Sequence, residues 1–261
     1  MRARKRFGQH FLEPAWADRL VAAIDPQPSD RFLEIGPGPG ALTLRLAPRV
    51  THLTAIELDR DLAATLAPRL PPNVTIVQGD FLDLPLDPIL AGGSLRAAGN
   101  LPYNVASPIV LKLIGACGGG TRLRDAPVML QREVAERLEA RPGTPAYGAL
   151  SIAVQLHADI RRLMTLPPGA FRPVPKVHSA VVRLTFRAPA VLPRDAALFD
   201  RMVRSMFTRR RKTLANALEP LAASLGKGSR AVLDRAGIEP TRRAETLDLA
   251  ELGRLADTLA E

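Results

Sequence analysis

Four consecutive residues, Asn100-Leu101-Pro102-Tyr103, combine the groups needed for chemistry on the exocyclic amine of adenine. That nitrogen is a poor nucleophile, because its lone pair is delocalised into the purine ring. Hydrogen-bond acceptors around its N–H groups would make it pyramidal and direct the lone pair at an electrophile. The side-chain oxygen of Asn100 and the carbonyl of Leu101 are candidate acceptors. Pro102 fixes φ and has no competing N–H, and Tyr103 offers a ring on which a base can stack. The same residues also fit a tight turn after a strand, so this interpretation depends on what precedes them.

A glycine-rich turn lies upstream. An apolar run that begins at Phe32 enters Gly36-Pro37-Gly38-Pro39-Gly40, and an apolar-periodic segment follows from Leu42 to Leu46. This order predicts the strand–turn–helix opening of a nucleotide-binding α/β unit. Glu57 ends a second apolar strand, at the separation of about 20 residues expected for a carboxylate that binds ribose hydroxyls. The alternative for Glu57 is an ordinary charge at a strand end.

The sequence of the glycine-rich turn is compatible with two cofactors. Gly36, Gly38 and Ala41 satisfy the dinucleotide fingerprint G-x-G-x-x-G/A, so NAD is one of them. Pro37 and Pro39 each remove a backbone N–H from the loop that would bind a pyrophosphate. S-adenosyl-L-methionine carries no phosphate and needs no such donors. The sequence therefore favours S-adenosyl-L-methionine over NAD.

A third predicted strand, Val74 to Gly79, ends in Asp80. The Asp80 carboxylate can accept from the adenine amino group of the cofactor, and Phe81 can pack beside that ring. The alternative for Asp80 is a turn or helix-cap aspartate.

Taken together, the motifs and their order resemble the KsgA (RsmA) family of small-subunit ribosomal RNA adenine dimethyltransferases over nearly the whole chain. The early motifs occur across many adenine methyltransferases, whereas the later ones are highly specific in this order. The segments that carry the resemblance are Phe7–Leu12, Glu34–Thr43, Ile56–Asp59, Gly79–Asp80, Gly99–Tyr103, Gln131–Arg137, Tyr147–Ser151, Phe171–Ser179 and Phe207–Leu214.

The resemblance implies a role for particular residues. It places the methyl donor among six of them: His10, Leu12, Gly36, Glu57, Asp80 and Asn100. It also implies that Phe171 faces Tyr103, so that the two rings sandwich a flipped target adenine; the alternative is that Phe171 is a core residue. Many members carry Asn where this chain has His10. A backbone contribution at that position makes the change harmless, whereas a side-chain contribution makes cofactor affinity respond to pH near the imidazole pKa.

The implied reaction is dimethylation of N6 on two adjacent adenosines in the 3′-terminal hairpin loop of 16S rRNA, within the small (30S) ribosomal subunit. Catalysis would rest on positioning and desolvation, and no metal is expected because four His and one Cys show no ligand spacing. Two alternatives stay open. One is a related large-subunit rRNA enzyme that confers macrolide resistance, which the Gly36–Gly40 loop and the Phe207–Leu214 segment fit less well. The other is a ribosome-assembly checkpoint factor whose binding role dominates over catalysis.

Charge supports an RNA partner. The chain has 261 residues, with 36 Lys+Arg against 26 Asp+Glu and a net charge of +10. Such a balance favours polyanion binding through phosphate contacts. Met1 to Arg6 forms a basic arm, and the run Arg209, Arg210, Arg211 and Lys212 is the candidate RNA-binding segment. The alternative for both is a solvated end or helix face. Aromatic residues are 4% of the chain, so shape and phosphate contacts should dominate over base stacking on a sheet.

The pattern along the chain predicts an α/β fold, and the resemblance makes it a Rossmann-like class I S-adenosylmethionine-dependent methyltransferase domain with a mostly parallel sheet over residues 1–188. Leu150–Leu156 and Ala180–Phe186 are predicted as its late strands. A small all-α RNA-binding domain is expected over residues 189–261. Apolar residues recur at helical spacing from Phe199 to Phe207, and shorter helices are predicted over Ser229–Ala236 and Leu247–Leu259. The acidic residues near the end are expected on solvated helix surface.

Cellular context follows from what the sequence lacks. No apolar stretch reaches membrane-spanning length, and His10, Glu13 and Asp18 interrupt any hydrophobic region behind the basic start, so no secretory signal is expected. The single cysteine, Cys117, excludes an internal disulfide and suits a reducing cytoplasm. Nothing in the sequence demands more than a monomer.

Overall fold

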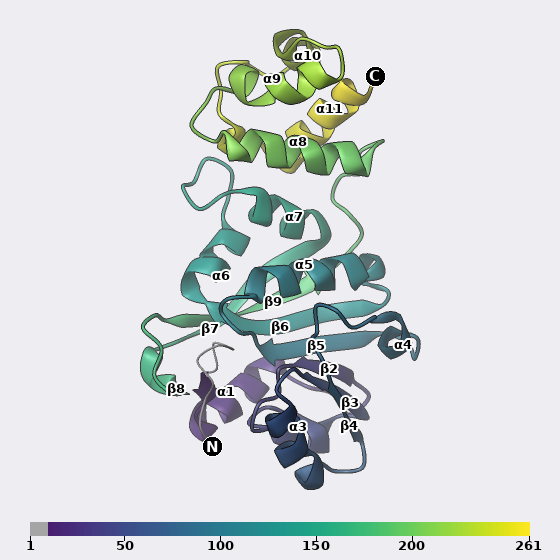
Figure 1. Ribbon diagram of the computed structural model, residues 1–261, viewed down its shortest axis with the longest axis vertical. Helices are drawn as coiled ribbons and strands as arrows, with labels where there is room; N and C mark the ends of the chain where they lie inside the picture. Colours follow the sequence, from purple (N-terminus) through teal and green to yellow (C-terminus); the bar gives the residue numbers. More distant parts are fainter. Residues whose placement is uncertain (1–9) are drawn as a thin grey trace. The chain divides into compact units, whose positions relative to one another are not determined.

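A computed structural model describes residues 10–261, which form two compact units (Figure 1). The sheet unit comprises the described residues up to Ala135 together with His157–Ala188, and the helical unit comprises Glu136–Leu156 and Pro189–Glu261. One boundary therefore follows Ala188. Residues 136–156 were predicted to lie in the first domain, but they belong to the helical unit because Tyr147, Ile152 and Leu156 are buried in its apolar core.

The sheet unit contains one seven-stranded sheet in the order β4-β3-β2-β5-β6-β9-β7. Its strands are β2 (Arg31–Ile35), β3 (His52–Glu57), β4 (Val74–Gln78), β5 (Leu95–Asn100), β6 (Leu123–Gln131), β7 (Ala158–Leu166) and β9 (Ser179–Phe186). The pairs among β4, β3, β2, β5 and β6 are parallel, whereas β9 runs antiparallel to both of its neighbours. The carboxyl ends of β2, β3, β4 and β5 consequently share one edge, where ligands bind in open α/β sheets.

Helices cover both faces of this sheet. They are α1 (Pro14–Ile24), α2 (Thr43–Leu46), α3 (Arg60–Leu66), α4 (Asp87–Leu90) and α5 (Ala106–Ala116). A further helix, α6 (Arg132–Glu139), begins in the sheet unit and ends in the helical unit. Residues of α1 and α2 share one apolar core with Phe32, Leu53 and Val181 of the sheet, and α5 lies on the opposite side (Figure 1). A separate two-stranded ladder joins β1 (Phe11–Leu12) to β8 (Phe171–Arg172).

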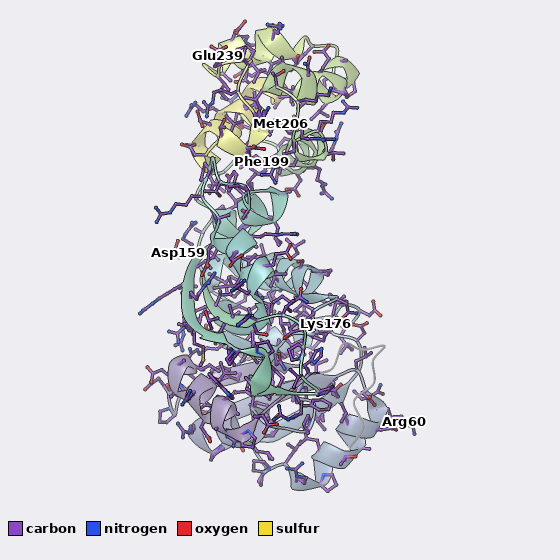
Figure 2. The ribbon with its side chains drawn as sticks, turned by 90° about the vertical axis from the view of Figure 1, so that its left-hand side faces the viewer. Arg60, Asp159, Lys176, Phe199, Met206 and Glu239 are labelled. Atoms are coloured by element: carbon purple, nitrogen blue, oxygen red, sulfur yellow. The ribbon has the colours of Figure 1, made fainter. Side chains whose placement is uncertain are left out.

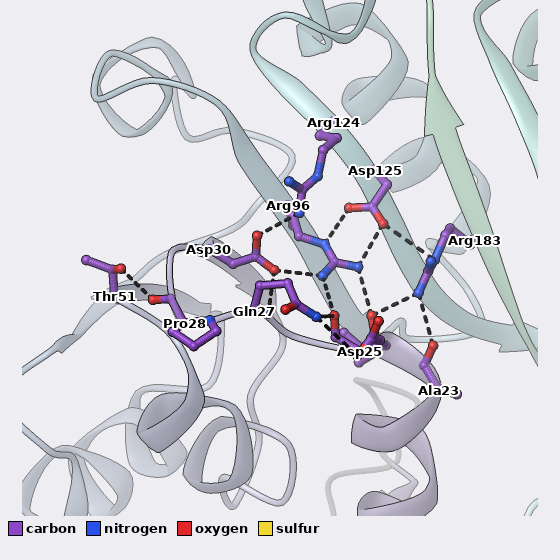
Figure 3. A network of polar contacts seen from close by, with 11 residues as sticks. Ala23, Asp25, Gln27, Pro28, Asp30, Thr51, Arg96, Arg124, Asp125 and Arg183 are labelled. Carbon is purple, nitrogen blue, oxygen red and sulfur yellow. Dashed lines mark hydrogen bonds and ion pairs between the residues drawn. The ribbon is translucent and has the colours of Figure 1, made fainter.

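A buried ion network fastens the end of α1 to the sheet (Figure 3). Arg96 of β5 donates to Asp125 of β6 at 2.7 and 2.9 Å and to Asp30 at 2.8 Å. Its remaining N–H groups donate to the carbonyls of Ile24 and Asp25 at 2.8 and 3.0 Å. These are carbonyls that a helix C-terminus leaves without an intrahelical partner. The network therefore fixes the helix that follows β1.

The helical unit is built from α8 (Ala196–Thr208), α9 (Leu214–Ser224), α10 (Ser229–Arg235) and α11 (Leu249–Ala260), with most of α7 (Ala149–His157). The predicted helices are confirmed. Phe199 and Met206 stand at i, i+7 on one face of α8, and both are buried in the apolar core of the helical unit (Figure 2).

The predicted strand over Leu150–Leu156 is wrong, because these residues form α7. Alternating apolar residues in this segment satisfy a period of two, but Ile152 and Leu156 also stand at the i, i+4 spacing of a helix. Those two side chains pack beside Tyr147 in the core of the helical unit. Tertiary packing thus selects the helical period over the strand period.

Candidate active site

A pocket opens at the shared carboxyl edge of the parallel strands. It contains every residue of the predicted methyl-donor site and all four residues of the Asn100–Tyr103 motif. These residues are His10, Leu12, Gly36, Glu57, Asp80, Phe81, Asn100, Leu101, Pro102 and Tyr103. The contacts between them determine what chemistry this pocket can support, while the function of each residue stays a prediction.

The backbone N–H groups of the three glycines in the glycine-rich turn all donate to acceptors within the protein. The N–H of Gly36 bonds to the Ile56 carbonyl at 2.9 Å, that of Gly38 to Glu57 Oε2 at 2.9 Å, and that of Gly40 to the Pro37 carbonyl at 2.9 Å. Pro37 and Pro39 have no N–H to offer. A pyrophosphate would find no donor in Gly36–Gly40, so the pocket fits a ligand without phosphates, as S-adenosyl-L-methionine is. Gly38 has φ +55°, a conformation that side-chain-bearing residues rarely adopt.

Glu57 holds the turn in place and keeps acceptor capacity. Its Oε2 accepts from Gly38 and its Oε1 accepts from the Asp59 N–H at 2.8 Å. Burial raises the pKa of Glu57, although these two N–H donors partly offset the rise. An ionised carboxylate accepts about four hydrogen bonds. Glu57 can therefore bind hydroxyl groups in addition to the two backbone donors.

Asn100, the last residue of β5, has a fixed side-chain amide. Its Nδ2 donates to the backbone carbonyl of His10 at 2.7 Å. Because that contact takes a donor, Oδ1 is left as the acceptor of this side chain. The following residue, Leu101, is buried, and its N–H bonds to the Met129 carbonyl at 2.9 Å. The two groups predicted to accept from an amine thus come from a rigid strand end.

Tyr103 is held at both ends. Its hydroxyl shares a hydrogen bond of 2.6 Å with Ser179 Oγ, at the start of β9. Its ring stacks on the His10 ring, with 5.3 Å between centroids and 26° between planes. His10 Nδ1 is in turn 2.7 Å from the Pro173 carbonyl. His10 thus contacts the site through its backbone and its side chain, a double role that the sequence alone leaves open.

Phe171 does not face Tyr103, so the predicted aromatic sandwich is wrong in this structure. Phe171 pairs with Leu12 in the β1–β8 ladder and is completely buried. It packs in the core that α1 shares with the sheet, which was the alternative considered for it. The side chain follows β8 inward because pairing with β1 places it over that core. The ring that stacks on Tyr103 belongs to His10 instead.

Two polar residues at the site were not predicted. Glu34 of β2 lines the pocket, and one of its carboxylate oxygens has no hydrogen-bond partner within the described chain. Burial, reinforced by the nearby charge of Glu57, raises the pKa of Glu34 to about 8. Lys112 of α5 contacts the turn that follows Asp80. Glu34 is the first residue of the Glu34–Thr43 motif, but nothing in the sequence indicates the contacts of Lys112.

The predicted RNA-binding run divides into two kinds of residue. Arg209, Arg211 and Lys212 are exposed and have no side-chain partner among residues 10–261. Arg210 bonds to Glu245 at 2.9 Å and donates to the Pro145 carbonyl at 2.6 Å. The basic arm over residues 1–6 lies outside the described residues.

The acidic residues near the end are not merely solvated, so that expectation is wrong. Glu251 bonds to Arg242 at 2.5 Å and completes a capping box with Asp248 at the start of α11. Glu261 pairs with Arg194 and Arg235. Several arginines of the helical unit are therefore neutralised within it.

Over residues 10–261, no group of three His, Cys, Asp or Glu side chains is arranged to hold a metal ion. Within the same range, every helix is too short or too polar to cross a membrane.

Comparisons with known proteins agree with this geometry. The model of the family described as "Ribosomal RNA adenine dimethylase" matches residues 1–260. Ribosomal RNA small subunit methyltransferase A of Syntrophotalea carbinolica is 47% identical over 261 residues, covering 99% of this chain and 97% of that protein. The protein of the same name from Pseudomonas fluorescens is 46% identical over 267 residues, covering 100% and 95%.

Solved structures resemble this chain over both units. A dimethyladenosine transferase from Plasmodium falciparum aligns with a TM-score of 0.77 at 26% identity, covering 94% of this chain and 96% of that one. The 23S rRNA methyltransferase ErmE aligns with a TM-score of 0.68 at 27% identity, covering 96% and 100%. These likenesses confirm the predicted fold class, a Rossmann-like class I domain with a mostly parallel sheet and a helical C-terminal part.

Proposed function

This chain belongs to the ribosomal RNA adenine dimethylase family, and we propose that it dimethylates N6 of two adjacent adenosines in the 3′-terminal hairpin loop of 16S rRNA. It is an S-adenosyl-L-methionine-dependent enzyme. The observation that carries the proposal is one pocket that combines a donor-poor glycine turn, the carboxylates of Glu57 and Asp80, and the motif from Asn100 to Tyr103. Relatives named for the small subunit share 46–47% of their residues with this chain and support the choice of RNA.

On this proposal, the residues around the glycine turn bind the methyl donor. S-adenosyl-L-methionine, when bound, supplies a methyl group activated by a sulfonium. The remaining lone pairs of Glu57 accept from the ribose hydroxyls, and Asp80 accepts from the adenine amino group beside Phe81. Gly36 has φ +69°, a backbone conformation that favours glycine, and a Cβ there would lie at an ordinary contact distance of 4.0 Å from the Asn100 carbonyl oxygen. His10 and Leu12 close the pocket from the N-terminal side.

The acceptor residues then orient the target amine. Asn100 Oδ1 and the Leu101 carbonyl accept from the N6 hydrogens and turn the nitrogen lone pair toward the methyl group. Pro102 keeps these acceptors free of a competing N–H. One face of the Tyr103 ring stacks on the base, while the His10 ring supports the other face of Tyr103. No strong base is needed, because the amine proton becomes acidic once nitrogen carries a positive charge.

The proposed partner is 16S rRNA within the 30S subunit, and the proposed acting form is a cytoplasmic monomer. A single chain supplies all of the predicted site residues, and Cys117 is a free, buried thiol. ErmE, named for 23S rRNA, is a more distant relative at 27% identity, so the large-subunit alternative is less well supported. The proposed activity also includes a part in late small-subunit biogenesis.

The decisive experiment incubates the protein with labelled S-adenosyl-L-methionine and unmethylated small subunits, then digests the RNA to nucleosides for mass spectrometry. We expect N6,N6-dimethyladenosine that maps to the 3′-terminal hairpin. Label in large-subunit RNA alone would favour the macrolide-resistance alternative.

The Asn100→Ala variant separates catalysis from binding. Loss of one positioned acceptor should lower methyl transfer by about 100-fold or more, with subunit binding nearly intact, because Asn100 is one acceptor within a large RNA interface. Asn216→Ala, on the exposed side of α9, is the control and should retain full activity. Normal growth and subunit maturation with Asn100→Ala would make the assembly role primary.

A further inference from the structure

Three backbone carbonyls of the turn after Asp80 accept from one ammonium group. Lys112 Nζ donates to the carbonyls of Phe81, Leu82 and Leu84 at 2.7, 2.7 and 2.6 Å. These oxygens lie in a single helical turn, closed by bonds from the Asp83 and Leu84 N–H groups to the Asp80 carbonyl. No helix continues from the turn, so its carbonyls have no intrahelical donors. Lys112 replaces the missing donors.

All three hydrogen-bond donors of the Lys112 side chain are satisfied by these carbonyls. A lysine ammonium has three N–H groups, and here each has one carbonyl. The Nζ atom also lies 5.4 Å from the centroid of the Phe81 ring, within range of a cation–π contact. The Leu84 side chain packs back against the residue before Asp80, because a Cβ on Gly79 would lie 3.0 Å from it.

The helix that carries Lys112 also borders the reaction site. Ile109, one turn earlier on α5, lines the pocket, and spacing of i, i+3 places both residues on one helix face. The same helix begins shortly after Tyr103, at Ala106. One rigid element therefore connects the loop from Asn100 to Tyr103 with the turn that presents Asp80 and Phe81.

We propose that Lys112 is a positioning residue for the adenine half of the methyl donor. By binding three carbonyls, it holds the turn so that the Asp80 carboxylate meets the adenine amino group and Phe81 packs beside the ring. The inference rests on the proposed function, which assigns adenine to Asp80. It predicts that Lys112 controls cofactor affinity and selectivity for the amino group without touching the cofactor itself.

The test compares two probes, S-adenosylhomocysteine and its inosine counterpart, in which a carbonyl replaces the adenine amino group. The wild-type protein should prefer the adenosyl probe, because Asp80 accepts from an amine and repels a carbonyl oxygen. Lys112→Met keeps the apolar stem and removes the donors. We expect its Kd for the adenosyl probe to rise at least tenfold and its preference between the probes to fall several-fold. Its kcat at saturating methyl donor should stay within about threefold of the wild type.

Two further variants separate positioning from stability. Lys112→Arg restores a cation with several donors and should recover most of the selectivity. Lys227→Met is the matched control, since Lys227 Nζ donates to the Leu259 carbonyl at 2.6 Å within the helical unit. It should lower the melting temperature without changing the probe ratio.

A Lys112→Met protein that melts earlier but keeps wild-type affinity and selectivity would overturn the inference, because the contact would then be structural alone. If that variant does not fold, Lys112→Gln, which keeps two donors, takes its place, and the ratio of its Kd values for the two probes is compared with that of the wild type. A wild-type protein that binds both probes equally also overturns the inference. One that binds neither probe overturns the proposed function as well.

Discussion

Glu34 is a buried acid in the pocket, and its protonation state affects the stability of the fold. Its pKa is raised to about 8, so the side chain is mainly neutral at pH 7. A group that binds its proton more tightly in the folded state contributes stability that is complete below its unfolded pKa of 4.5 and is lost as pH rises toward 8. The free energy of unfolding should therefore fall by up to about 1.4 kcal/mol per pH unit across this window.

Glu34→Gln tests this effect, because the amide keeps the shape and cannot ionise. We expect the free energy of unfolding of the variant to fall much less than that of the wild type between pH 4.5 and 8. The stability of the variant relative to the wild type should therefore increase as pH rises. Urea denaturation at several pH values measures both curves. Parallel curves would show that Glu34 titrates normally.

Single residues differ in how well the sequence predicts them. The resemblance placed Glu57, Asp80 and Asn100 in one site, and the structure brings them into one pocket because each lies at or just after the end of a parallel strand and those ends meet along one edge. Phe171 was misplaced because its direction depends on the pairing of β8 with β1, strands about 160 residues apart. The partner of Tyr103 depends on the same ladder, which carries His10 beside it. Local patterns contain no information on such distant pairings.

Among elements, α1 depends on the ion network around Arg96 for its position. Arg96, Asp30 and Asp125 are all nearly inaccessible, with exposures of 4%, 5% and 5%. Arg96→Met would remove the buried cation that Asp30 and Asp125 share, which leaves each carboxylate with one more peripheral arginine, Arg124 or Arg183. It would also remove the donor of the Asp25 carbonyl at the end of α1. We expect a loss of about 3–5 kcal/mol in the free energy of unfolding. Denaturant titration at fixed pH measures it.

The matched control is Arg122→Met, which removes an ion pair with Asp87 at the surface. Solvent screens that pair, so its loss should cost about 0–1 kcal/mol. Equal losses for the two variants would mean that the Arg96 network contributes no more than a surface pair. Replacing Asp125 with Asn in the Arg96→Met background should recover part of the loss, because it removes a buried charge that keeps only the longer contact with Arg183, at 3.4 Å.

Elements with one clear period were predicted well, and elements with two compatible periods were not. The apolar residues of α8 fit a helix alone, whereas Leu150–Leu156 fit both a strand and a helix, and burial beside Tyr147 decided between them. The domain assignment of residues 136–156 failed because packing, and not order along the chain, determines which unit they join. Their apolar side chains complete the core of the helical unit, although they precede β7 in sequence.

At the scale of the whole molecule, the count of 36 Lys+Arg overstates the number of cations that can meet RNA. Arg96, Arg210 and Arg242 form ion pairs within the protein. Charge counting therefore predicts the sign of the interaction with RNA, and the structure indicates which cations are available. In the run predicted to bind RNA, these are Arg209, Arg211 and Lys212.

The double variant Arg209→Ala, Arg211→Ala should weaken binding to the small subunit and lower the dependence of log K on log salt by about 1 for each phosphate that is no longer neutralised. Arg210→Ala is the matched control from the same run. Its guanidinium is engaged by Glu245 and Pro145, so it should lower the melting temperature and leave the salt slope near that of the wild type. Binding titrations at four or more salt concentrations give the slopes. An unchanged slope in the double variant would remove this run from the RNA interface, and a reduced slope in Arg210→Ala would mean that the Glu245 pair opens when RNA binds.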